Sequence, residues 1–215
     1  MNLSNLFEKQ LLLREKIINK HNLQEQDLIP GLILAFQVEL GELANEQRSW
    51  KHWSNDRKPR IEAYVECSAC NGTGDLNYEM VQEDAEGNGD HEYIDCPDCD
   101  CSGFSGTRNP LLEEYVDGLS FILEIGSELS EECLIDEDYP TYWITTDDTQ
   151  SIIEQFQTVY REIADFSRDY DVMTYSELVS QYLGLGKMLG FSWIEIEQAY
   201  HSKHQINLQR QEEGY

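Results

Sequence analysis

Basic residues and long apolar runs are both scarce in this sequence of 215 residues. Lysine and arginine number 15 against 42 aspartates and glutamates, so the formal net charge is −27. A chain this acidic is not expected to bind DNA or an anionic membrane through non-specific attraction. No apolar run approaches the roughly 20 residues that cross a bilayer, and the polar N-terminus is unlike a signal peptide. We therefore expect a soluble, cytoplasmic protein that binds neither nucleic acid nor membranes.

Convincing strand patterns are also lacking outside the middle of the chain, where apolar residues recur at helical spacing instead. Six helices are predicted, over residues 3–21, from near Pro30 to about Arg48, and over 109–129, 149–169, 176–190 and 192–211. The fold class that this pattern predicts is an all-α bundle.

Residues with capping preferences mark several of the expected helix ends. Asn109 is the expected N-cap of the third helix, and Asp148 or Thr149 that of the fourth. Gly190 suits the position after the end of the fifth helix, and Ser192 opens a Ser-x-x-Glu capping box at the start of the sixth.

The helical pattern disappears between residues 54 and 108, where glycine, asparagine, aspartate, serine and cysteine dominate. We predict that this segment is inserted into an all-α domain formed by residues 1–53 and 109–215. The segment contains two Cys-x-x-Cys pairs, made by Cys67 with Cys70 and by Cys96 with Cys99.

Two such cysteine pairs predict a structural zinc site, because four thiolates bind Zn²⁺ tetrahedrally. A disulfide framework is the alternative, and it requires an oxidising compartment that nothing in the sequence indicates. His91 and Cys101 lie near the pairs but are not needed to complete four ligands, and Cys133 is expected to be a small core residue.

Carboxylates interrupt the apolar pattern of two predicted helices. Glu39 and Glu42 are three residues apart on one helix, as are Glu114 and Asp117 on another, so each pair shares a helix face. Two facing helices of this kind would place four carboxylates in one space, which is unfavourable unless cations neutralise them. Mg²⁺ is the predicted ion, since it takes oxygen ligands and bridges carboxylates to phosphates. A di-iron bundle would require Glu-x-x-His pairs, which neither motif has.

A third of the basic residues lie close together, just after the first acidic motif. They are Arg48, Lys51, Arg57, Lys58 and Arg60. From the sequence, this cluster either clamps phosphates or only balances local charge.

Together these motifs resemble the dimeric dUTPases, an all-α, MazG-like group of NTP pyrophosphatases. The similarity lies in ELGELANE, WKHW, EEYVDGLSFIL and YHSKHQINLQRQEEGY, in that order along the chain. It implies a homodimer that hydrolyses dUTP to dUMP and pyrophosphate with two or three Mg²⁺ ions per site. Two features depart from the group: the cysteine-rich insertion replaces a short loop, and Val38 stands where MazG-type motifs often have a glutamate.

The resemblance also implies roles for individual residues. Glu39, Glu42, Glu114 and Asp117 would hold Mg²⁺, and Glu42 would accept the proton of the attacking water. The implied substrate contacts are phosphate binding by Lys51, Lys203 and Arg210, base recognition by Gln10 and Asn207, stacking by Trp50 or Trp53, and closure by Tyr215. Core packing is the alternative for either tryptophan, and His201 and His204 are expected to be exposed.

Two other functions stay open at this stage. The same fold could act on dCTP or another nucleoside triphosphate, because one amide orientation can change which base is read. A zinc-stabilised protein-interaction module with inert carboxylates is the alternative that is not an enzyme.

Overall fold

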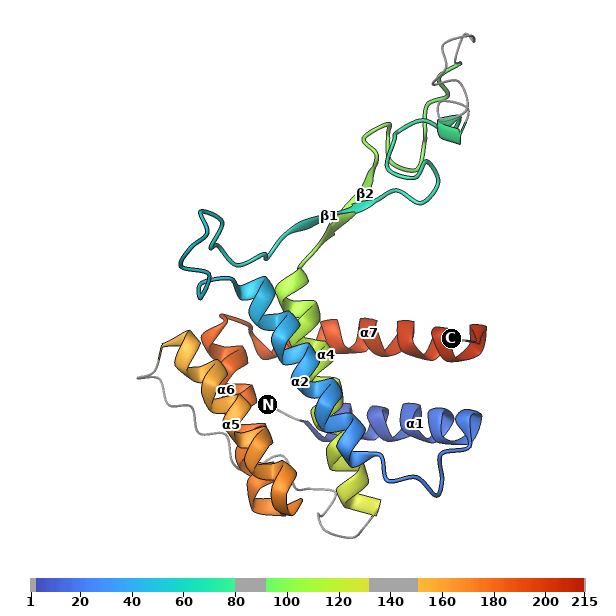
Figure 1. The fold of residues 1–215 in the computed structure, drawn as a ribbon. Coiled ribbons are helices and arrows are strands. Elements are labelled where there is room, and N and C mark those ends of the chain that lie inside the picture. Colours follow the sequence, from blue (N-terminus) through green and yellow to red (C-terminus); the bar gives the residue numbers. More distant parts are fainter. Residues whose placement is uncertain (1–2, 80–91, 132–150, 215) are drawn as a thin grey trace. The chain divides into compact units, whose positions relative to one another are not determined.

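The computed structural model describes residues 3–79, 92–131 and 151–214 (Figure 1). The chain divides into two compact units, a helical unit of Met1–Pro59 with Leu111–Tyr215 and a second unit of Arg60–Pro110. The sequence analysis placed the insertion at residues 54–108. None of the described helices has an apolar stretch long enough to cross a bilayer.

Helices account for nearly all regular structure of the described residues, as the all-α prediction expected. Their bounds are α1 (Ser4–His21), α2 (Ile29–Gln47), α4 (Pro110–Glu131), α5 (Ile152–Asp169), α6 (Val172–Met188) and α7 (Trp193–Glu213). The largest difference from the prediction is at α6, which begins four residues before the expected Ser176. Its start is set by the Asp171 side chain, which accepts a hydrogen bond from the amide of Met173.

Capping residues explain other helix ends. The capping box of Ser192 and Glu195 at the start of α7 is confirmed. An equivalent box of Ser151 and Glu154 starts α5, whereas Asp148 and Thr149 lie outside the described residues. Gly190 follows α6 with a φ of +90°, a left-handed conformation that glycine adopts without strain, as predicted.

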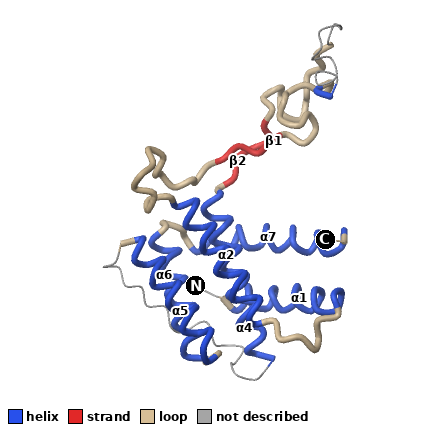
Figure 2. Tube along the Cα trace, viewed as in Figure 1, coloured by secondary structure: helices blue, strands red, loops and turns tan. Residues whose placement is uncertain are grey.

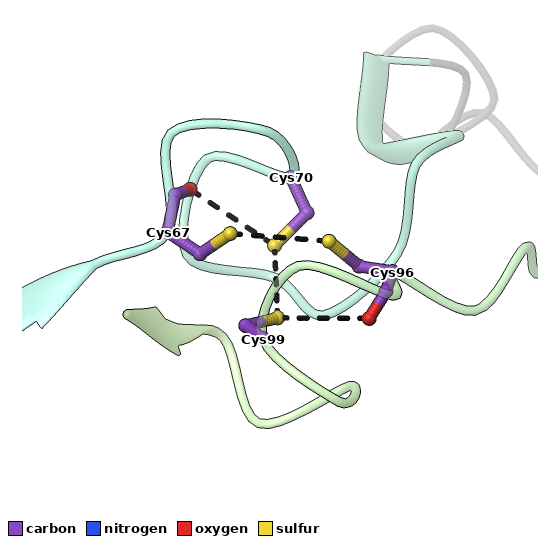
Figure 3. Close-up of side chains that lie close together, drawn as sticks. All are labelled: Cys67, Cys70, Cys96 and Cys99. Atoms are coloured by element: carbon purple, nitrogen blue, oxygen red, sulfur yellow. Dashed lines mark hydrogen bonds between the residues drawn. The ribbon is translucent and has the colours of Figure 1, made fainter. Parts of the chain in front are cut away.

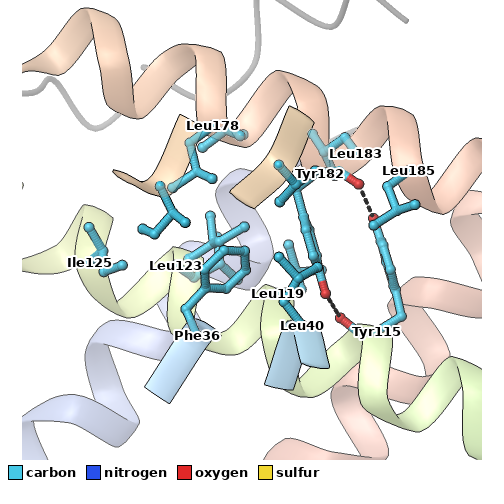
Figure 4. Packing of buried hydrophobic residues seen from close by; sticks show 14 of the residues in the cluster. Phe36, Leu40, Tyr115, Leu119, Leu123, Ile125, Leu178, Tyr182, Leu183 and Leu185 are labelled. Atoms are coloured by element: carbon cyan, nitrogen blue, oxygen red, sulfur yellow. Dashed lines mark hydrogen bonds between the residues drawn. The ribbon is translucent and has the colours of Figure 1, made fainter. Parts of the chain in front are cut away.

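The α4 and α6 helices approach closely because tyrosines lie over glycines. Tyr182 and Tyr115 stack with ring centroids 4.8 Å apart, and the Tyr182 hydroxyl donates to the carbonyl of Tyr115 at 2.7 Å (Figure 4). A Cβ added at Gly118 would collide with the Tyr182 hydroxyl, and one added at Gly126 with the Tyr175 hydroxyl. These two positions on α4 therefore require glycine, and the register of α4 is fixed by the contacts.

The α1 and α7 helices lie side by side (Figures 1 and 2). The Tyr200 hydroxyl oxygen lies 3.2 Å from the carbonyl oxygen of Leu6, and His204 Nε2 lies 2.9 Å from the carbonyl oxygen of Lys9. His204 is buried and His201 half-buried. The prediction that both histidines are exposed was wrong, because α1 covers this face of α7.

A two-stranded antiparallel sheet forms the regular part of Arg60–Pro110 (Figure 2). Strand β1 (Ala63–Glu66) pairs with β2 (Phe104–Arg108), and Ala63 lies opposite Arg108. These strands were not predicted from the sequence, because they have no buried face and therefore no alternating apolar pattern. Their pairing brings the entry and exit of the inserted segment to one place.

We predict that Gly118→Ala destabilises the protein by about 1–3 kcal/mol, because an overpacked core must shift to admit the methyl group. In a chain of this size that lowers Tm by about 2–4 °C per kcal/mol. Thermal unfolding followed by circular dichroism measures the change.

The matched control is Gly31→Ala in α2, where an added Cβ would have no atom within 4 Å. The free energy of unfolding of this variant should be unchanged or higher by up to about 1 kcal/mol, because alanine has a better helix propensity than glycine. An equal decrease of Tm in the Gly118 and Gly31 variants would show that the Tyr182 contact does not constrain α4.

Candidate functional site

A cavity of about 660 Å³ opens in the helical unit, lined by residues of α1, α2, α4 and α7 and of the loop before α2. Its polar wall includes Glu39, Glu42, Glu114 and Asp117, the four predicted carboxylates. Its apolar wall consists of Leu13, Ile17, Ile18, Leu23, Leu28, Leu32 and Phe121. Leu32 and Glu39 are seven residues apart on α2, about 10 Å along the axis, so the two walls belong to different ends of the cavity.

The carboxylates converge because each pair occupies one face of its helix. Oxygen atoms of Glu39, Glu42 and Glu114 all lie within 4.8 Å of one another. Asp117 lines the same cavity, and its Oδ2 accepts a hydrogen bond of 2.6 Å from Lys203 Nζ on α7. Three of the four acids therefore form a cluster, and the fourth is paired with a lysine.

Burial and mutual repulsion make this cluster resist ionisation. Burial, then the charges of Asp117 and Glu42, raise the pKa of Glu39 from 4.5 to about 7. The pKa of Glu114 also rises to about 7, through burial and the charges of Asp117, Glu42 and Glu39. Burial raises the pKa of Asp117 as well, although its hydrogen bond to Lys203 opposes this rise. A bound divalent cation would remove this repulsion.

The donor atoms at the cluster suit a hard divalent cation. The acids offer only carboxylate oxygens, which are the ligands that Mg²⁺, Ca²⁺ and Mn²⁺ prefer over softer metals. Glu42 is exposed whereas Glu39 and Glu114 are half-buried, so an ion here would be accessible from the cavity.

Cationic and amide side chains of α7 line the cavity together with the acids. Lys203, Asn207 and Arg210 are spaced by four and three residues, so they share one helix face. The positive charge of Arg210 lowers the pKa of Asp117, as that of Lys203 does. All three of these predicted substrate residues therefore line the cavity that holds the acid cluster.

A buried polar network forms another part of the wall. Gln10 Nε2 donates to Glu124 Oε2 at 2.6 Å, and the Tyr200 hydroxyl donates to Gln10 Oε1 at 2.7 Å. Arg14 Nη1 lies 3.1 Å from Glu124 Oε1 and 2.8 Å from Glu128 Oε1. Of these five residues, only Gln10 was predicted from the sequence. Glu124 follows Asp117 by seven residues on the same helix face, and that spacing was the missed signal.

Trp50, Lys51 and Trp53 do not line the cavity. Trp50 Nε1 donates to the carbonyl of Ala44 at 2.8 Å, which folds the indole back onto the end of α2. Lys51 Nζ lies 5.3 Å from the Trp50 ring, and Trp53 is 67% exposed. Neither tryptophan packs in the core, so the alternative of core packing was wrong.

The basic cluster after α2 includes one residue with a clear structural role. Arg48 is buried, has a φ of +65°, and pairs with Asp56 at 2.9 Å between Nη2 and Oδ2. Arg57, Lys58 and Arg60 are exposed and do not line the cavity. For Arg48, local charge pairing is therefore the correct interpretation rather than a phosphate clamp. Tyr215, the predicted closing residue, lies outside the described residues.

Four buried cysteines of Arg60–Pro110 form a second cluster (Figure 3). The Sγ atoms of Cys67 and Cys96 are 3.8 Å apart, and those of Cys70 and Cys99 are 3.7 Å apart, so no disulfide joins them. This arrangement is compatible with a zinc site. Cys101 is exposed and lies outside the cluster, while His91 and Cys133 lie outside the described residues.

Comparison with protein families gives a match over most of the chain. A family model described as dUTPase matches residues 2–67 and 103–215. The chain belongs to this dUTPase family. Comparisons with curated proteins and with solved structures found no match. The family match includes the acid cluster but skips residues 68–102, which contain Cys70, Cys96 and Cys99. Membership of the dUTPase family therefore says nothing about a metal at the cysteines.

We predict that the metal-free protein becomes less stable as pH rises from about 4.5 to 7. Glu39 and Glu114 have a pKa of about 7 in the folded protein against an ordinary value of 4.5. The stability that their neutral forms contribute is complete below 4.5 and is lost as pH rises through 7. Glu39→Gln should therefore raise Tm at pH 8 in EDTA by a few degrees, at about 2–4 °C per kcal/mol.

Glu15→Gln is the matched control, because Glu15 is exposed on α1 and does not line the cavity. Added Mg²⁺ should stabilise the unaltered protein and the Glu15 variant, but stabilise the Glu39 variant much less. An equal response of all three proteins to pH and to Mg²⁺ would contradict the repulsion between these carboxylates.

Proposed function

We propose that this member of the dUTPase family hydrolyses dUTP to dUMP and pyrophosphate in a Mg²⁺-dependent reaction. The observation that carries the proposal is the convergence of Glu39, Glu42 and Glu114. The pKa values of Glu39 and Glu114 are raised to about 7 in this cluster. Asp117, Lys203 and the Arg210 side chain line the same cavity. Clustered acids beside cations suit a substrate whose phosphates bind through metal ions on one side and basic groups on the other.

Glu39, Glu42, Glu114 and Asp117 would hold two or three Mg²⁺ ions. Bound there, Mg²⁺ supplies phosphate binding and lowers the pKa of a coordinated water. The chain's own residues do the rest. Lys203 would move from Asp117 to a phosphate oxygen once the acids are neutralised, Arg210 would bind phosphate with its planar fork, and Glu42 would accept the proton of the attacking water.

The other end of the cavity suits a nucleobase. Its wall is apolar apart from the buried network, and a flat base would displace water from leucine, isoleucine and phenylalanine side chains. Gln10 and Asn207 are the proposed base contacts. The amide of Gln10 is oriented because Glu124 accepts from its nitrogen and Tyr200 donates to its oxygen.

The same network is the reason to keep dCTP as a second candidate substrate. Gln10 offers an amide donor, and Glu124 beside it offers a carboxylate acceptor. A uracil edge presents carbonyls around one N–H group, whereas a cytosine edge presents an amino group beside a ring acceptor. A donor and an acceptor side by side can pair with either edge.

Further properties belong to the same proposal. The four clustered cysteines would hold a structural Zn²⁺ that takes no part in the reaction, and their free thiols suit a cytoplasmic protein. A homodimer, which the resemblance to the dimeric dUTPases implies, is also proposed. Leu34 and Val38 suit such an interface, because they are apolar residues four positions apart on α2 that are 62% and 49% exposed.

The proposal predicts pyrophosphate release from dUTP in the presence of Mg²⁺ and none in EDTA. Purified protein would be tested against dUTP, dCTP, dTTP, dATP, dGTP and UTP. Glu39→Gln and Asp117→Asn should each lower the rate by about 100-fold or more, as the loss of a major electrostatic group does. Glu15→Gln should leave it unchanged.

The outcomes separate the candidates. Pyrophosphate release from dCTP alone would support the proposed metal site but contradict the assignment of uracil as the base. Absence of metal-dependent release from every nucleotide would overturn the proposed reaction and favour the zinc-stabilised interaction module.

A further inference from the structure

The unit Arg60–Pro110 has a core made of cysteines. Its buried hydrophobic cluster consists of Cys67, Cys70, Cys96 and Cys99, with Ala69 packed beside them. Most of the large apolar side chains among its described residues are instead exposed, namely Ile61, Tyr64, Val65, Leu76, Tyr93, Ile94 and Phe104. Among its other described residues, Pro110 is buried and Tyr78 is half-buried. A unit this short with so few buried aliphatic or aromatic side chains lacks the hydrophobic stabilisation that normally offsets the entropy of folding.

The cysteine core is built from two copies of one eight-residue loop. Residues 67–74 read CSACNGTG and residues 96–103 read CPDCDCSG, so cysteine, cysteine and glycine recur at the first, fourth and eighth positions. The amide of Gly74 donates to Cys70 Sγ at 3.1 Å, and that of Gly103 donates to Cys99 Sγ at 3.3 Å. Each loop therefore presents two thiols and one amide that stabilises negative charge on sulfur.

The two copies also interlock. The amide of Cys67 donates to the carbonyl of Gly103 at 2.9 Å, and the amide of Cys96 donates to the carbonyl of Gly74 at 3.0 Å. Both glycines have a φ of +79°, and a Cβ on either would collide with a carbonyl oxygen of the other loop. Neither loop can therefore complete its hydrogen bonds alone, and the arrangement is close to two-fold symmetric.

The sulfur positions match a metal ion at the centre of this symmetric pair. Zn–S bonds of about 2.3 Å in a tetrahedron require sulfur atoms about 3.8 Å apart. The separations across the two loops are 3.8 Å for Cys67 with Cys96 and 3.7 Å for Cys70 with Cys99 (Figure 3). Four thiolates this close would repel one another strongly without an ion between them, as the acids of the helical unit do.

We infer that Arg60–Pro110 folds only around its metal: two copies of one loop enclose a single Zn²⁺ ion, and binding the ion and folding this unit are one event. The helical unit has its own hydrophobic core, formed by residues such as Phe36, Leu40 and Tyr182. Loss of zinc therefore unfolds the inserted unit and leaves the helices folded. The folded state of this part of the chain is therefore conditional on the metal.

Hydrogen–deuterium exchange of the full-length protein tests this inference, read by mass spectrometry together with the zinc content. The zinc-loaded protein should hold one ion per chain and protect amides in residues 63–79 and 92–108. After zinc is chelated, these peptides should exchange as an unfolded chain does, while peptides of α2, α4 and α6 keep their protection. Added Zn²⁺ should restore the protection.

Cys99→Ser and Cys101→Ser form a matched pair, since both remove a thiol from the same loop and only Cys99 belongs to the cluster. Cys99→Ser should lose zinc and protection in residues 63–79 and 92–108, and Cys70→Ser should do the same because it is the symmetric position. Cys101→Ser should keep both. The inference would be overturned if the amides of the zinc-free unit stayed fully protected. It would also be overturned if the Cys99 and Cys101 variants lost equal amounts of zinc and of amide protection. None of these readouts depends on nucleotide hydrolysis, so the proposed reaction can fail without affecting them.

Discussion

Repulsion between carboxylates that the core holds together is the constraint on which the functional site depends. Glu114 and Asp117 flank Tyr115 on α4, whose stacking on Tyr182 fixes this part of the helix. Gly118, the next residue after Asp117, admits the Tyr182 hydroxyl against the helix backbone. A shift of α4 that separated the acids would therefore disturb the stacking of Tyr115 on Tyr182. Protonation, the Lys203 ion pair and a bound cation are the remaining ways to relieve the repulsion.

Each unit brings acidic groups close together that would repel one another when ionised, but the two units do so with different donor atoms. The helical unit presents carboxylate oxygens from half-buried and exposed positions, which suits a hard ion that must exchange with substrate and water. The unit Arg60–Pro110 presents four buried thiols, which suit an ion that stays in place. The family match covers the first cluster and skips most of the second. Residues 68–102 of this unit lie outside the family match. Among its described residues, the buried cluster consists of the four cysteines, with the partly buried Ala69 packed beside them.

Local spacing made much of this molecule predictable from sequence. Helix periodicity places Glu39 with Glu42, Glu114 with Asp117, and Lys203 with Asn207 and Arg210 on shared helix faces. The packing of α2, α4 and α7 then brings these faces to one cavity. Features that depend on contacts distant in sequence were not predictable. His204 is buried because α1 covers it. Trp50 donates a hydrogen bond back to Ala44 after α2 ends at the left-handed Arg48. Arg14 and Glu124, 110 residues apart, meet only once α1 and α4 are packed together.

The most direct test is a crystal structure of the full-length protein with Mg²⁺ and a dUTP analogue whose bond between the α- and β-phosphates cannot be hydrolysed. Our account predicts metal ions bound by Glu39, Glu42, Glu114 and Asp117, triphosphate against Lys203 and Arg210, and uracil between the apolar wall and Gln10. It also predicts that Lys203 has left Asp117 for the phosphates. A nucleotide bound elsewhere, or bound in this cavity with the carboxylates free of metal, would contradict the central claim that these acids form a metal-dependent nucleotide site.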